Sequence, residues 1–108
     1  MDILYLSHPL RGAGPLDISR AYDNKTKMDD ICVRMRETRP DALLLSPIHA
    51  FGFASIFEPQ EWVLDQCLKL LEFATELWVF GDWRNSEGCR MEIEFAEQRG
   101  MRIVYADQ

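Results

Sequence analysis

The sequence has no apolar run long enough to cross a membrane and no segment that resembles a signal peptide. A membrane helix needs roughly 18–20 consecutive apolar residues. The first residues, Met1 to Ile3, are not a basic start followed by a long apolar stretch. Internal repeats and low-complexity segments are also absent. We therefore expect a cytoplasmic protein that has no membrane partner.

Cysteine and histidine are scarce. The three cysteines, Cys32, Cys67 and Cys89, are odd in number and widely spaced, and each lies in a segment of helical pattern. This spacing fits neither a disulfide framework nor a zinc site, so it predicts free thiols in a reducing compartment. With only His8 and His49 beside them, we expect no metal centre and no resident cofactor.

Positive charge is also low, because 12 basic residues face 18 acidic residues and give a net charge of −6. Binding to a nucleic acid polymer needs basic surface that neutralises phosphates, so this class of partner is not expected. Nine of the 12 basic residues are arginine, whose planar guanidinium suits phosphate and carboxylate groups. The composition thus favours a small anionic ligand.

The sequence does contain enough apolar material for one core. A hydrophobic fraction of 47% with three Trp excludes disorder, and 108 residues predict a single domain over residues 1–108. Short apolar runs typical of buried strands occupy residues 3–7, 42–45, 77–80 and 103–105. Helical spacing of apolar residues covers residues 28–38, 58–73 and 86–99.

In two segments, the apolar residues recur at neither helical nor strand-like spacing. Residues 17–27 fit a loop or a short helix, and residues 48–57 read as an ordered loop that could form the wall of a pocket. A fifth strand within residues 46–57 stays open as an alternative. Strands that alternate with helices imply a parallel sheet with crossover helices. We predict a three-layer α/β/α sandwich, flavodoxin- or Rossmann-like, with a parallel sheet of four to five strands.

The most informative stretch is the turn and helix that follow the strand at residues 77–80. In such a sheet, ligands bind where strand ends meet helix starts, and free N–H groups there attract anions. Glu92 lies at the border of the apolar stripe of this helix, so it is partly desolvated. The alternative is an ordinary surface glutamate paired with an arginine. Ser86 is in the position of a helix N-cap and could also bind phosphate.

The loop after the first strand reaches the same edge of the predicted sheet. Between Ser7 and Gly14, Arg11 could hold an anion, and Gly12 would let the backbone approach it closely. Glycine-rich loops are, however, most often simple turns, and His8 reads as a loop residue more than as a general base.

One helix has apolar residues on two sides. Met91 and Phe95 lie at i and i+4, away from the buried stripe of residues 86–99. A second apolar side indicates either an internal helix or a subunit contact. We favour the subunit contact and expect a homodimer or a larger homo-oligomer.

Two segments resemble the signatures of the nucleoside 2-deoxyribosyltransferase-like superfamily. They are YLSHPLRG at residues 5–12 and SEGCRMEIEFA at residues 86–96. The closest branch consists of small bacterial and phage domains of unknown function with a W-x-x-S-x-G-C-x-x-E-x-x-x-A pattern. Residues that match this pattern in register are Trp83, Ser86, Gly88, Cys89, Glu92 and Ala96.

The resemblance implies a site and a reaction. Glu92 matches the nucleophile that attacks the anomeric carbon of a 2-deoxyribonucleoside, and Tyr5 matches the tyrosine that holds this carboxylate. In the related deoxynucleoside 5′-monophosphate N-hydrolases, the positions of Arg11, Gly12 and Ser86 bind the 5′-phosphate. We add Ser7, Trp83 and Gly88 to the predicted substrate-binding residues.

The superfamily usually supplies an aspartate that protonates the leaving base. No residue here matches it in register, and the nearest candidates are Asp65 and Asp82. The resemblance implies an N-glycosidase or deoxyribosyltransferase for a nucleoside or its 5′-monophosphate. A catalytically inactive nucleotide-binding or sensor module and a structural interaction domain are the alternatives.

Overall fold

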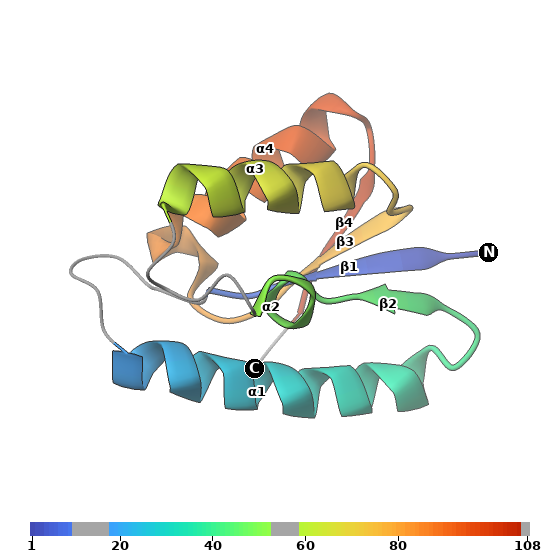
Figure 1. Ribbon diagram of the computed structural model, residues 1–108. Coiled ribbons are helices and arrows are strands. Elements are labelled where there is room, and N and C mark those ends of the chain that lie inside the picture. The colour runs from blue at the N-terminus through green and yellow to red at the C-terminus, as the bar shows by residue number, and fades with distance from the viewer. Residues whose placement is uncertain (10–17, 53–58, 107–108) are drawn as a thin grey trace.

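The computed structural model describes residues 1–9, 18–52 and 59–106, which form one parallel sheet with helices on both faces (Figure 1). The strand order is β2-β1-β3-β4. The strands are β1 (Ile3–Ser7), β2 (Leu43–Leu45), β3 (Glu76–Val79) and β4 (Arg102–Tyr105). Each pair of neighbouring strands is parallel, so the predicted topology is confirmed.

The helices form the two outer layers of the sandwich. They are α1 (Ile18–Thr38), α2 (Pro47–Ala50), α3 (Gln60–Leu71) and α4 (Glu87–Gln98), with a short 3-10 turn, η2 (Trp83–Asn85), before α4. Figure 1 shows α1 below the sheet and both α3 and α4 above it. Within the described residues, no helix combines the length and the apolar character that a membrane span requires.

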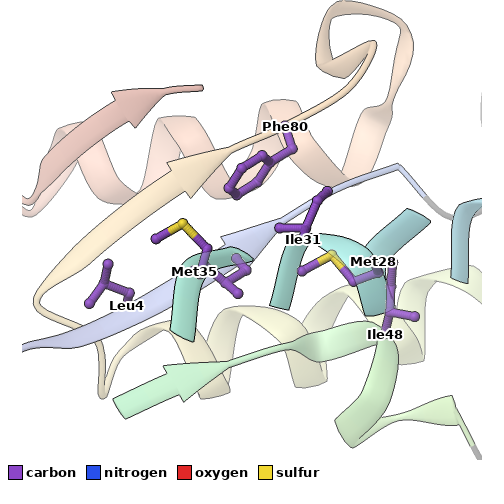
Figure 2. Close-up of a cluster of buried hydrophobic side chains, with 7 residues drawn as sticks. Leu4, Met28, Ile31, Met35, Ile48 and Phe80 are labelled. Atoms are coloured by element: carbon purple, nitrogen blue, oxygen red, sulfur yellow. The ribbon is translucent and has the colours of Figure 1, made fainter. Parts of the chain in front are cut away.

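The core between α1 and the sheet is made of aliphatic, methionine and aromatic side chains. It contains Leu4, Leu6, Met28, Ile31, Met35, Ile48 and Phe80, six of which are labelled in Figure 2. Met28, Ile31 and Met35 follow helical spacing along α1, so one face of this helix is buried. Ile48 of α2 closes the same core.

The second core lies between the sheet and the pair α3 and α4. Its buried members are Tyr5, Cys67, Leu71, Leu77, Val79, Ile93 and Ala96. Because side chains of a strand alternate between its faces, β1 sends Leu4 and Leu6 to the α1 side. The same alternation sends Tyr5 and Ser7 toward α4, and both are fully buried.

Two sequence interpretations are corrected or resolved by the structure. The uncertain segment before residue 28 is helical from Ile18, as part of α1. The predicted loop at residues 48–57 is wrong for its first part, because Pro47–Ala50 form α2. Ser46 caps this helix and Pro47 occupies its first turn, where a proline is well tolerated. Residues 53–58 lie outside the described part of the chain, and the described residues give four strands in the sheet.

The carboxyl ends of β1 and β3 approach each other closely at Gly81. This residue has φ 71°, and a Cβ placed on it would lie 3.0 Å from His8 Nε2 and 3.1 Å from Pro9 Cδ. A side chain would therefore be strained in conformation and crowded by the end of β1. The strand order reverses between β1 and β3, which is where open α/β sheets bind ligands.

At the end of the sheet where β3 begins, opposite Gly81, an ion-pair network surrounds Glu76. This buried carboxylate accepts hydrogen bonds from both Nη atoms of Arg39, at 3.3 and 3.2 Å, and from Trp78 Nε1 at 3.0 Å. The hydrogen bonds from Arg39 are the main cause that lowers the pKa of Glu76. Arg39 also pairs with Asp2 at 2.8 Å and so links α1 to the start of β1.

Replacing Glu76 with alanine is expected to destabilise the protein by about 1–3 kcal/mol at pH 7, because Arg39 and Trp78 lose a buried acceptor. The lowered pKa means that this stabilisation is present above the ordinary glutamate pKa and is lost as pH falls through the lowered value. Urea unfolding at pH 7 and at pH 3 measures both effects. Equal losses at the two pH values would contradict an ionic role.

Candidate active site

The candidate site is centred on Glu92, in the middle of α4. Ser86 is the N-cap of this helix, and its Oγ accepts a hydrogen bond from the Cys89 amide at 3.3 Å. Gly88 lets α4 pack tightly on α3, since a Cβ there would lie 2.9 Å from Leu64 Cδ2. The helix therefore lies close to its neighbours, and Glu92 is buried with 6% of its surface exposed.

Both carboxylate oxygens of Glu92 are held by hydroxyl groups of β1. The Tyr5 hydroxyl donates to Oε2, and the Ser7 hydroxyl donates to Oε1 at 2.7 Å. Tyr5 and Ser7 are two residues apart and therefore point to the same face of the sheet. We call the arrangement of Tyr5, Ser7 and Glu92 the carboxylate cradle. It brings together residues from the two ends of the chain.

Burial sets the electrostatics of the cradle. Desolvation raises the pKa of Glu92 to about 7, although the hydrogen bonds from Tyr5 and Ser7 lower it. Desolvation also raises the pKa of Tyr5 well above its ordinary value, with the charge of Glu92 as the next cause. Tyr5 is thus a neutral donor near neutral pH, whereas Glu92 exchanges its proton in the physiological range. A carboxylate with this property in a buried site is typical of catalytic groups.

Of four other predicted site residues, two lie outside the described part of the chain and two are exposed aspartates. Arg11 and Gly12, predicted to bind an anion, lie outside the described residues. Asp65 is on the solvent side of α3, where its side chain is 60% exposed and pairs with Lys69 at 3.0 Å. Asp82 is exposed after β3 and accepts a hydrogen bond from Asn85 Nδ2 at 2.7 Å. Neither aspartate is part of the carboxylate cradle, and the predicted role of an acid stays untested.

Trp83 connects the turn before α4 to the edge strand. Its ring lies 5.2 Å from the ring of Tyr105 in β4, and the Arg84 guanidinium lies 4.5 Å from its centre. Arg84 in turn offers its backbone carbonyl to Arg90 Nη1 at 2.6 Å. These contacts fix η2 against β4 and α4. The predicted role of Trp83 in substrate binding is not tested by them.

His8 is buried at the carboxyl end of β1, next to Gly81. Its Nδ1 lies 2.7 Å from the Pro9 carbonyl oxygen, which can only accept, so the proton is on Nδ1. The histidine is thus an ordered residue at the point where the strand order reverses. The sequence indicated a loop residue here and gave no sign of its burial.

Several contacts could not be inferred from the sequence. Cys89 Sγ lies 3.3 Å from Ser7 Oγ, and the buried Cys67 belongs to the same core cluster as Tyr5. Ser7 donates a hydrogen bond to Glu92, and its predicted role in substrate binding is not tested by this contact. A strand's alternating period indicated that Tyr5 and Ser7 share a face, but it contains no information about which helix covers that face.

A second polar cluster lies at the carboxyl end of β2. Ser46 Oγ is 2.6 Å from His49 Nδ1 and accepts the His49 amide at 3.4 Å, while His49 Nε2 contacts Asp29 of α1. The order of these atoms is that of a nucleophile, a base and an orienting acid. Since Ser46 also caps α2, the cluster has a sufficient structural explanation: it starts α2 and ties it to α1.

The second apolar side of α4 is partly covered within the chain. Phe95 packs against the core of α3 and α4, and the Arg99 guanidinium lies 4.4 Å above its ring. Met91 is also partly buried. The predicted subunit contact through these two residues stays a prediction.

The described residues contain no group of three or more His, Cys, Asp or Glu side chains placed to hold a metal ion. All three cysteines of the sequence are free thiols, as the spacing predicted. The chemistry that the cradle can perform therefore depends on a carboxylate, two hydroxyls and two nearby thiols.

Fold and site together define a parallel α/β domain with a buried carboxylate that contacts strand β1. A family described as a domain of unknown function, DUF7768, matches residues 2–106. The chain belongs to this family. A search of curated proteins found no match.

Proposed function

We propose that this protein is an N-glycosidase or deoxyribosyltransferase that cleaves the N-glycosidic bond of a nucleoside or its 5′-monophosphate. The observation that carries the proposal is the carboxylate cradle, in which Tyr5 and Ser7 each hold one oxygen of Glu92. The resemblance of the flanking segments to the nucleoside 2-deoxyribosyltransferase-like superfamily supplies the substrate class.

In the proposed reaction, ionised Glu92 attacks the anomeric carbon of the sugar. The C–N bond breaks, its electron pair leaves with the base, and the base takes a proton from solvent. Water, or a second base, then attacks the same carbon, loses a proton to solvent and releases Glu92 from the glycosyl ester. The two hydroxyls of the cradle fix the carboxylate in one orientation, which reduces the entropy lost in reaching the attacking geometry.

The same proposal assigns the substrate's phosphate to Arg11, Gly12 and the Ser86 end of α4. A helix of 12 residues presents free amide groups at its N-terminus, and an anion is stabilised there. Trp83 and Gly88 would line the sugar and base side. Free thiols fit a reducing cytoplasm, where nucleotides are abundant.

One observation favours a second candidate, a nucleotide-binding or sensor module without turnover. Glu92 is almost completely buried and both of its oxygens are occupied, while Asp65 and Asp82 point to solvent. A site with a nucleophile but no acid opposite it would bind a nucleotide and leave it intact. Calorimetry with nucleoside monophosphates would then give saturable binding without release of base.

The deciding experiment is incubation of the protein with a panel of deoxynucleosides and their 5′-monophosphates, each with and without a second free base. Chromatography of the products is expected to detect the released base or the exchanged nucleoside. Quenching in acid followed by mass spectrometry should find a deoxyribosyl adduct on the peptide that contains Glu92. No base release from any member of the panel would refute the enzyme.

A further inference from the structure

The carboxylate cradle continues at its Ser7 end into a buried thiol. Ser7 Oγ lies 2.7 Å from Glu92 Oε1 and 3.3 Å from Cys89 Sγ. These three side chains form one chain of contacts in the order thiol, hydroxyl, carboxylate. At the other end of the cradle, the Tyr5 hydroxyl bonds Glu92 Oε2.

The positions of the protons follow from the number of donors. A hydroxyl has one proton, and an ionised carboxylate only accepts, so Tyr5 and Ser7 both direct their protons to Glu92. The Ser7 oxygen then has only lone pairs left for Cys89, and the S–H group must be the donor. Cys89 is protonated near neutral pH, because burial raises the pKa of its thiol to about 11.

We propose that Cys89 is a positioning residue for Glu92. It donates its S–H to the Ser7 hydroxyl and so keeps the proton of this hydroxyl directed at the carboxylate. Because a hydrogen bond received by a hydroxyl strengthens the one it donates, the thiol stabilises the ionised form of Glu92 through Ser7. The effect of this role on the rate of base release rests on the proposed function, whereas its effect on the pKa of Glu92 does not.

No cation replaces this stabilisation among the described residues. Besides burial, the pKa of Glu92 responds only to its hydrogen bonds with Tyr5 and Ser7. The groups that face it are those two hydroxyls from β1, the thiol from α3 and the thiol from its own helix. Arg90 affects the pKa of Cys89 but is not among the causes for Glu92.

The test is a carbon-13 NMR titration of the Glu92 carboxyl group in the full chain. Cys89→Ala is expected to raise the pKa of Glu92 by about half a pH unit. Cys89→Ser, which keeps a donor at this position, is expected to stay within about 0.2 unit of the wild type. Cys32→Ala is the matched control, because this thiol packs against the core on the α1 side of the sheet, and it should change nothing.

A double-mutant cycle separates positioning from packing. If Cys89 acts through the Ser7 hydroxyl, then adding Cys89→Ala to Ser7→Ala should cause no further shift of the Glu92 pKa. Equal shifts for Cys89→Ala and Cys89→Ser, or additive shifts in the cycle, would overturn the role, since packing alone produces both results. An unchanged titration of Glu92 in Cys89→Ala would overturn it as well.

Kinetics provide the readout that depends on the proposed function. Cys89→Ala is expected to lower kcat for base release about twofold at pH 7 with little change in KM, and Cys89→Ser should restore it. If no variant releases base while the titration shifts as expected, the proposed function fails and the positioning role stands. If base is released but the titration does not shift, the positioning role fails and the proposed function stands.

Discussion

Replacing Glu92 with glutamine is expected to lower base release at least about 1,000-fold. The glutamine amide has nearly the same shape and can still accept from Tyr5, but it cannot attack the anomeric carbon. The variant should therefore bind substrate and fail to form the glycosyl ester. Initial rates and the yield of the adduct, measured for both proteins on the best substrate, check this result.

Glu94→Gln is the matched control, because Glu94 is on the same helix and exposed to solvent. It should leave the rate unchanged. Residual activity in Glu92→Gln above one tenth of the wild-type rate would exclude Glu92 as the nucleophile.

The pH dependence of kcat/KM in the wild-type protein also tests the role of Glu92. With a pKa of about 7 for Glu92, the ionised fraction rises about tenfold between pH 6 and pH 8. Since the nucleophile must be ionised, kcat/KM is expected to rise by the same factor. A rate that falls over this range would mean that Glu92 acts in its protonated form, as an acid.

Glu92→Gln is also expected to stabilise the folded protein at pH 8. Its effect on the free energy of unfolding should be more favourable at pH 8 than at pH 4 by up to about 3 kcal/mol. In the unfolded chain Glu92 ionises near the ordinary pKa of 4.5, but in the folded protein burial raises this pKa to about 7. The unfolded state therefore binds fewer protons between these two values. Wild-type stability contains a term that falls as pH rises through this window and is constant above it.

Urea unfolding of wild type and Glu92→Gln at pH 4, 6 and 8 measures this effect. The titration of every other group, including Glu76, cancels in the difference between the two proteins. The difference should grow from pH 4 to pH 8 in favour of the glutamine variant. A difference that does not depend on pH would contradict the raised pKa of Glu92.

Local patterns in the sequence were sufficient to predict most of the architecture. The four short apolar runs became the four strands, and helical spacing placed α3, α4 and the second half of α1. Ser86 was predicted as an N-cap and is one. These predictions succeeded because buried strands and amphipathic helices depend on neighbours within a few residues.

The missed helix α2 had a readable signal. Ser46 followed by Pro47 is a typical capped helix start. The apolar and aromatic residues that follow, however, do not recur at helical spacing. A helix of four residues also offers too few positions for any period to be recognised.

The candidate site was only partly predictable for a different reason. Helical spacing placed Glu92 at the border of the buried stripe, whereas the structure buries it fully in contact with β1. Tyr5 and Glu92 are 87 residues apart, and no local pattern connects them, so their pairing was predicted only from the family resemblance. The thiol contacts depend on how α3 and α4 pack, which sequence spacing does not determine.

The alternation of β1 places a constraint on how this protein can change. Leu4 and Leu6 fill the core under α1, while Tyr5 and Ser7 hold Glu92 on the other face. A single inserted residue within this strand would exchange the two faces. Leucines would then meet the carboxylate, and hydroxyls would enter the methionine-rich core. Five consecutive residues thus determine the polar contacts on one face of the sheet and the packing on the other, so the pairing of Glu92 with Tyr5 and Ser7 depends on the phase of β1.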